Sequence, residues 1–256
     1  MRNKVLIYCD YGCSDITNLQ ETVGAYFSPK NIKVGLVDAN DIIKNDVLNK
    51  DVLAFILPGG ASTPFRMKLR TLGDNKIKEY IRRGGTYLGI CAGAYYACDF
   101  IEFEKDVPEL RICTDESLKI INADAVGTLH KELGILPYSR TANSAAVVRL
   151  KSVKNNDEYI SYYHGGPYFN VKGTNIDVLA VYEDIKGKPP AIISSSYGEG
   201  RVIASGVHFE DSGVQLQKAV HHLRVDAKSA KENADKLIKN EQLRMSLVNK
   251  LMGLMK

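Results

Sequence analysis

The sequence of 256 residues lacks the features that mark several large classes of protein. No apolar run approaches the length of a membrane-spanning helix, and the run at residues 5–9 is too short for a signal peptide. The net charge of +4 is too small to indicate nucleic-acid binding. We therefore expect a cytoplasmic protein that binds neither membranes nor nucleic acid.

Cysteine is also scarce, with five residues at irregular spacing. An odd number without a regular pattern is typical of a reducing compartment rather than of a disulfide framework. Cys9 and Cys13 are close in sequence, but no second cluster of Cys or His has the spacing of a zinc site. The sequence therefore predicts no metal site, and no motif in it predicts a cofactor.

Internal repeats and low-complexity linkers are absent, so we expect one α/β domain over residues 1–212 with a helical extension over residues 213–256. In the first half, continuously apolar segments alternate with helical patterns, which is typical of a parallel sheet covered on both faces. The expected strands are residues 5–9, 34–38, 52–57 and 86–90, and the expected helices are residues 16–27, 41–49 and 76–83.

Beyond residue 100, short β-like segments separated by glycine and proline predict hairpins and a meander, so the sheet is expected to be mixed. These segments are residues 119–121, 145–150, 159–163, 177–182, 191–196 and 201–206. Residues 214–255 carry apolar side chains at three-to-four spacing and predict a packing helix or helix pair. Basic side chains outnumber acidic ones there, which indicates a solvated face; a protein partner or an oligomer contact through this helix is the alternative.

A Gly-x-Cys-x-Gly motif follows the apolar segment 86–90, and small and aromatic residues at helical spacing follow the motif. This order of strand, sharp turn and helix is typical of a nucleophile elbow, in which the backbone segments approach so closely that only glycine fits. Cys91 occupies the position of the nucleophile, between Gly89 and Gly93. The start of the helix would favour its thiolate form. The alternative is a buried structural cysteine, but such a cysteine does not need a glycine on each side.

A thiol nucleophile for acyl transfer needs a base, a residue that orients the base, and donors that stabilise the oxyanion. His208 follows an apolar segment and Glu210 comes two residues later, so strand periodicity places both side chains on one side. We expect His208 to be the base and Glu210 to orient it. The expected oxyanion donors are the N–H groups of Ala92, Gly59 and Gly60. The other histidines are His130, His164, His221 and His222.

Taken in this order, the motifs resemble the class I glutamine amidotransferase superfamily and, more narrowly, the amidotransferase-like N-terminal region of eukaryotic biotin-protein ligases. The matching segments are residues 57–60, 89–93 and 208–210 for the superfamily, and residues 58–61, 89–96, 101–103 and 163–169 for the ligases, within residues 4–212. The resemblance implies a flavodoxin-like fold, with a mixed and mostly parallel sheet flanked by helices, and a Cys-His-Glu triad. It also implies that Tyr95, His164, Gly165 and Gly166 belong to the substrate-binding region.

Two departures from the family pattern leave the function open. Glutamine-using members usually carry Gln where this sequence has Tyr95, and the ligase segment with its Gly-Arg-Gly-type loop is absent. The first hypothesis is a Cys91-dependent amidase, hydrolase or amidotransferase that acts on a small-molecule amide or a peptide. The alternatives are a catalytically silent binding or regulatory module, and redox or glyoxalase-like chemistry in which Asp10 polarises the thiol. The aromatic residues expected to reshape the pocket of a binding module are Tyr11, Tyr96, Tyr163, Tyr168 and Phe169.

Overall fold

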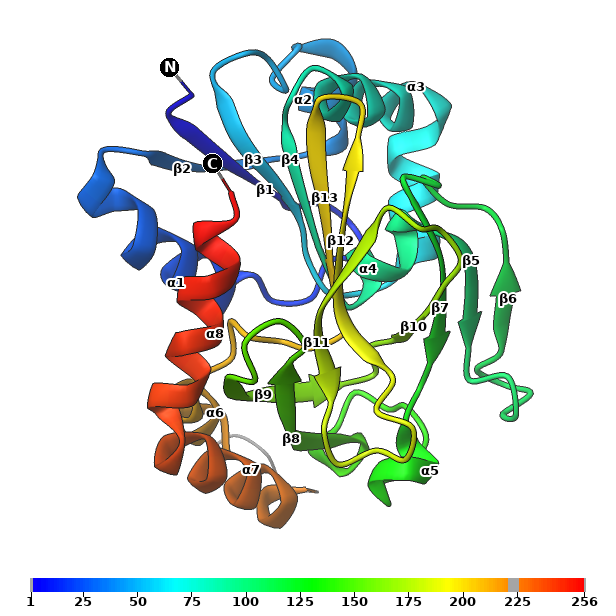
Figure 1. Cartoon of the computed structure of the whole chain (residues 1–256), viewed down its shortest axis with the longest axis vertical. Coiled ribbons are helices and arrows are strands. Elements are labelled where there is room, and N and C mark those ends of the chain that lie inside the picture. Colours follow the sequence, from blue (N-terminus) through cyan, green and yellow to red (C-terminus); the bar gives the residue numbers. More distant parts are fainter. Residues whose placement is uncertain (1, 221–225, 256) are drawn as a thin grey trace.

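The computed structural model of the chain describes residues 2–220 and 226–255, and a large mixed sheet forms its centre (Figure 1). The sheet has nine strands in the spatial order β2 (Lys33–Val37), β1 (Lys4–Tyr8), β3 (Val52–Leu57), β4 (Thr86–Ile90), β13 (Gly200–Ser205), β12 (Pro190–Tyr197), β11 (Ile176–Tyr182), β8 (Ala145–Ser152) and β9 (Glu158–His164). Neighbours from β2 to β13 are parallel, and neighbours from β13 to β9 are antiparallel. The α/β fold expected from the sequence is confirmed.

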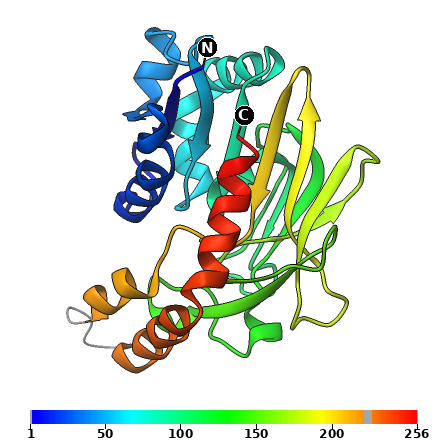
Figure 2. The same cartoon turned by 60° about the vertical axis from the view of Figure 1, so that its left-hand side comes forward.

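The parallel strands are apolar because other elements cover both of their faces. The covering helices are α1 (Thr17–Phe27), α2 (Ala39–Lys44), α3 (Ser62–Arg82), α4 (Ala92–Ala97) and α8 (Glu241–Gly253). Along β1, Leu6 and Tyr8 belong to the core shared with α2, α3 and α4, whereas Val5 and Ile7 belong to the core shared with α1 and α8. This alternation follows the two-residue period of a strand. Figures 1 and 2 show α8, in red, running along the sheet.

A second sheet packs beside α4, although the sequence patterns predicted a single sheet. Its four strands lie in the order β10 (Tyr168–Val171), β7 (Ile121–Gly127), β5 (Cys98–Phe103) and β6 (Ile112–Thr114). No turn residue separates α4 from β5, so the sequence carries no signal for the change of element. Cys98 and Ile101 point into the core that α4 fills, which holds the second sheet against that helix.

Helix α3 is much longer than the segment 76–83 expected from the sequence, because it begins at Ser62. Pro64 lies in its first turn, where a missing N–H removes no helical hydrogen bond. The helix is interrupted at Arg70, whose backbone is not helical (φ 54°, ψ −177°). Turn-forming residues before the helix and this interruption obscure the periodicity of its first half.

The C-terminal extension consists of α6 (Gly213–Val220), α7 (Ala227–Lys239) and α8. Leu247, Val248 and Leu251 of α8 are buried in the same core as Leu19 of α1, as expected for a packing helix. A protein partner through this extension, the alternative to a solvated face, stays a prediction. A short helix, α5 (His130–Leu133), follows β7. Over residues 2–220 and 226–255, we find no helix with the length and apolar character needed to span a membrane.

Candidate active site

The strand order explains how residues far apart in the sequence meet at one edge of the sheet. β4 lies between β3 and β13, and all three are parallel, so their carboxyl ends open at the same edge. Ile90 pairs with Ser205 at the ends of β4 and β13, and the Cys91 N–H donates to the Ser205 carbonyl over 2.9 Å. The segments that carry Gly59, Cys91 and His208 therefore leave the sheet side by side.

Cys91 lies on a strained turn. Its backbone has a positive φ (φ 48°, ψ −104°), which is uncommon for a residue other than glycine. A Cβ atom on Gly89 would collide with the Gly93 carbonyl, and one on Gly93 would collide with the Leu57 carbonyl. The two glycines therefore let the turn fold back against β3 and β4, and they hold the thiol at the edge of the sheet.

His208 and Glu210 form a buried pair beside Cys91. His208 Nδ1 lies 2.8 Å from Glu210 Oε1, and the two residues are 8% and 7% exposed. Burial alone would lower the pKa of His208, but the charge of Glu210 and the neighbouring Cys91 side chain raise that pKa well above its usual range. The arrangement therefore favours an imidazolium next to Cys91. Helix α4, which follows Cys91, has only six residues.

The protein backbone fixes the position of the His208 ring. The His208 N–H donates to the Tyr162 carbonyl over 2.8 Å, and a Cβ atom on Gly59 would lie 2.7 Å from His208 Cε1. On the next residue, the Phe209 carbonyl accepts a hydrogen bond of 2.7 Å from Arg244 Nη1 of α8. The C-terminal helix thus contacts the backbone of the His208 segment, a contact that the sequence did not predict.

The expected oxyanion donors divide into two groups. Gly60 and Ala92 line the cavity that contains Cys91, and within the described residues neither N–H has a backbone acceptor. Their assignment as oxyanion donors stays a prediction that the lining of the cavity supports. Gly59 is not in the lining of this cavity; it lies under the His208 ring, where its lack of a side chain makes room for the imidazole, and its role as a donor stays a prediction.

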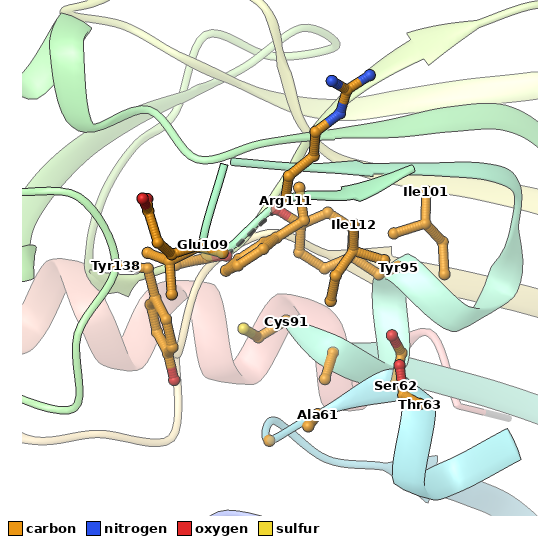
Figure 3. A pocket seen from close by; sticks show the side chains of 15 residues that line it. Ala61, Ser62, Thr63, Cys91, Tyr95, Ile101, Glu109, Arg111, Ile112 and Tyr138 are labelled. Carbon is orange, nitrogen blue, oxygen red and sulfur yellow. Dashed lines mark hydrogen bonds between the residues drawn. The ribbon is translucent and has the colours of Figure 1, made fainter. Parts of the chain in front are cut away.

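The cavity beside Cys91 has a volume of about 340 Å³ (Figure 3). Tyr95, Phe103 and Tyr138 contribute rings to its wall, and Arg111 extends away from Cys91 at its rim. Tyr138 is held by its N–H, which donates to the buried Glu104 carboxylate over 2.7 Å. Phe103 lies in the matching segment 101–103 but had no site role assigned to it, and sequence patterns did not mark Tyr138 or Arg111, which lie in irregular segments.

Tyr95 and the His164-Gly165-Gly166 motif have structural contacts of their own. The Tyr95 hydroxyl donates to the Gly165 carbonyl over 3.2 Å, and Cys91 Sγ lies 3.6 Å from the His164 carbonyl oxygen. The His164 imidazole faces away and donates to the Ser139 carbonyl over 2.7 Å, and burial lowers its pKa to about 4. This motif therefore contacts Cys91 through its backbone, and His164 is a neutral residue that is not placed to act as the base.

The remaining candidates from the sequence lie elsewhere. His130 Nδ1 lies 3.0 Å from Glu104 Oε2, beside a different cavity, and His221 and His222 fall outside the described residues. Asp10 forms an ion pair with Lys68 rather than a contact with Cys91. None of the five aromatic residues expected to fill a binding pocket lines the cavity: Tyr11, Tyr96, Tyr163, Tyr168 and Phe169.

One cluster of possible metal ligands overlaps the site. Donor atoms of His208, Glu210 and Asp211 lie within 4.8 Å of one another. His208 and Glu210 are hydrogen-bonded to each other, and Asp211 Oδ1 accepts a hydrogen bond of 2.7 Å from Asn18. Burial, together with the neighbouring Glu210 carboxylate, raises the pKa of Asp211 to about 6. This hydrogen bonding fits a network that positions His208.

The strand order and the elbow define a protein with the class I glutamine amidotransferase-like fold. A solved glutamine amidotransferase has a TM-score of 0.54 at 19% identity, with 80% of this chain and 90% of that chain covered. A second one, from Thermotoga maritima, has a TM-score of 0.61 at 14% identity, with 100% and 99% covered. At these identities the similarity concerns the fold.

Within that class, the chain belongs to the family described as "Biotin-protein ligase, N terminal", whose model matches residues 3–256. The match includes α6, α7 and α8. An uncharacterized protein of Chlamydia muridarum is 31% identical over 214 residues, covering 81% of this chain and 80% of that protein. The biotin-protein ligase of Schizosaccharomyces pombe is 25% identical over 214 residues, but the match covers only 33% of its length. The chain thus spans a third of that ligase.

Proposed function

We propose that this chain is a cysteine-dependent amidase or amidotransferase-like enzyme in which Cys91, His208 and Glu210 form a catalytic triad. The Cys91 thiol gives its proton to His208 and its sulfur attacks the carbonyl carbon of an amide, so the S–H bond breaks, a C–S bond forms and negative charge moves to the oxygen. The ring nitrogen of His208 that does not bind Glu210 donates a proton to the leaving nitrogen as the C–N bond breaks. A water molecule, deprotonated by His208, then hydrolyses the thioester and releases the carboxylic acid and the thiol.

The other groups of the site support this reaction. The Gly60 and Ala92 N–H groups are available to the developing oxyanion, and a single such donor contributes about 10²–10³-fold in rate where it has been tested. Glu210 keeps the imidazole in one orientation and raises its pKa. A small-molecule amide, or the end of a peptide, is the substrate class that a cavity of about 340 Å³ accommodates.

The observation that carries the proposal is the buried His208–Glu210 pair next to a thiol that lines a cavity. A structural cysteine needs neither a neighbouring His–Glu pair nor a cavity beside its sulfur, yet Cys91 has both. Cys98 is fully buried in the core and Cys113 is exposed on β6, so these two residues provide internal comparisons.

The test is the rate at which a chloromethyl ketone labels each cysteine, measured by peptide mass spectrometry. Cys91 should react faster than Cys113. His208→Ala should lower the labelling rate of Cys91 by about 10²–10⁴-fold, because the base that takes the thiol proton is lost. His130→Ala is the matched control and should leave the rate unchanged, since His130 lies beside a different cavity. Labelling of Cys91 no faster than that of Cys113 would contradict the proposal.

A binding module without turnover is the second candidate, and Tyr95 favours it because this residue replaces the Gln of glutamine-using relatives. The cavity beside Tyr95 is open, so it can hold a ligand whether or not a reaction follows. In this case an amide should raise the melting temperature without release of ammonia or amine. Release of ammonia that depends on Cys91 would rule the second candidate out.

A further inference from the structure

The cavity beside Cys91 has a continuous aromatic wall. The Tyr95 and Phe103 rings meet edge to face with centroids 5.8 Å apart, and the Phe103 and Tyr138 rings meet in the same way at 5.4 Å. Ile101, Leu110 and Ile112 complete this side of the cavity. Edge-to-face rings hold one another in place, so the wall presents a fixed apolar surface to a ligand.

The wall carries no charge close to the thiol. Burial raises the pKa of Tyr95 and of Tyr138 above the usual range, so both phenols are neutral. The Tyr95 hydroxyl is already donated to the Gly165 carbonyl, which leaves the ring to face the cavity. Within the described residues, the only acidic or basic side chains in the lining are Glu109 and Arg111; both are exposed at the rim, and Arg111 extends away from Cys91 (Figure 3).

This distribution of groups is unfavourable for glutamine. A bound glutamine would bring an ammonium and a carboxylate into the site, and charged groups taken out of water need partners that are themselves buried. Glu109 and Arg111 are exposed to solvent, where ion pairs contribute little. Apolar groups, in contrast, gain affinity for each methylene that they bury against such a wall.

We infer that the substrate of this site is the amide of a short apolar carboxylic acid, aliphatic or aromatic, and not glutamine. The inference rests on the proposed function, because it assigns the acyl group that Cys91 would carry. The cavity of about 340 Å³ lies at the small end of the range for ligand sites, which fits a short acyl chain. The acyl chain of the substrate enters beside the aromatic wall, and the amide carbonyl lies between the Cys91 thiol and the N–H groups of Gly60 and Ala92.

The test uses a matched series of chloromethyl ketones on the full chain. Each reagent alkylates sulfur: the C–S bond forms, the C–Cl bond breaks and chloride leaves. The series comprises alkyl reagents of increasing chain length, a phenyl-substituted reagent, and a glutamine-shaped reagent with α-amino and α-carboxylate groups. The rate at Cys91, divided by the rate at Cys113, should rise by roughly fourfold for each methylene that the cavity buries. The glutamine-shaped reagent should be the slowest.

Two variants distinguish the effect of a charge in the cavity wall from the effect of an added charge elsewhere on the protein. Leu110→Asp places a charge in the wall and should remove most of the dependence on chain length, whereas Leu136→Asp, a 58% exposed residue outside this cavity, should not. If Cys91 reacts in a His208-dependent way but prefers the glutamine-shaped reagent, the inference is wrong and the proposed function stands. If no reagent labels Cys91 faster than Cys113, the proposed function fails, and the inference fails with it.

Discussion

Gly59→Ala changes the site by one methyl group, placed against the face of His208. The added Cβ atom would lie 2.7 Å from His208 Cε1, whereas an ordinary contact needs about 3.4 Å. The imidazole must therefore move by roughly 0.7 Å. Its Nδ1 is held by Glu210 and its backbone N–H by the Tyr162 carbonyl, so the ring cannot move without loss of these hydrogen bonds.

The expected cost follows from that displacement. A misplacement of about 1 Å in a catalytic group lowers the rate on the order of 10²-fold, so we expect Gly59→Ala to slow Cys91 labelling by about 10- to 100-fold. That range corresponds to about 1.4–2.7 kcal/mol of activation free energy. The assay is the chloromethyl ketone labelling rate of Cys91 relative to Cys113, measured on folded protein at neutral pH.

The matched control for this variant is Gly24→Ala. Gly24 lies within α1, and a Cβ atom there meets nothing within 4 Å, so the substitution should leave the labelling rate unchanged and add up to about 1 kcal/mol of stability. If Gly59→Ala labels as fast as the wild type while His208→Ala labels slowly, the close packing of His208 on Gly59 does not matter for reactivity.

Three further changes test the site and its support. Glu210→Gln should lower the midpoint of the His208 titration followed by NMR, because burial without the carboxylate charge disfavours the imidazolium. In the wild type the raised pKa adds stability that is fully present below about pH 6.5 and is lost as pH rises through the folded-state pKa; the variant should lose this dependence. Arg244→Met leaves the buried Phe209 carbonyl without its donor and should cost about 1–3 kcal/mol in urea unfolding. Leu251→Ala, at a position 1% exposed, should lower the free energy of unfolding by about 2–5 kcal/mol, because it leaves a cavity in the core.

Each of these changes has a comparison that decides its outcome. An unchanged His208 titration in Glu210→Gln would mean that the carboxylate does not control the imidazole. Lys231→Met removes an exposed ion pair on α7 and should have no measurable effect on the free energy of unfolding. An equal loss of unfolding free energy in Arg244→Met and Lys231→Met would contradict a stabilising role for the hydrogen bond between Arg244 and the Phe209 carbonyl. Leu72→Ala, at a position 65% exposed, is the control for Leu251→Ala on α8 and should change the free energy of unfolding much less.

The first half of the fold could be predicted because its signals are local. The apolar segment 52–57 predicts β3 with the same bounds, and continuous burial of that strand is the reason. The second sheet could not be predicted, since β6 has only three residues and β5 follows α4 without a turn. The interruption of α3 at Arg70 similarly masked the start of that helix.

The candidate site could be predicted where its residues lie close together in the sequence, as His208 and Glu210 do. The pairing of β4 with β13, which lies about a hundred residues later in the sequence, is a tertiary contact that local patterns do not encode. It was expected only through the resemblance to a family. The orientation of His164 was not predictable, because its partners Ser139 and Ser144 lie on an irregular segment. Of the cavity wall, Tyr95 was predicted, whereas Tyr138 was missed for the same reason.

The central claim is that Cys91 forms a covalent acyl intermediate. The most direct measurement is mass spectrometry of the protein after brief incubation with hexanamide or its p-nitroanilide and an acid quench, followed by peptide mapping. We expect a hexanoyl thioester on Cys91 that is absent in Cys91→Ala and that decays with release of hexanoic acid. No adduct on Cys91, or equal acylation of Cys113, would contradict it.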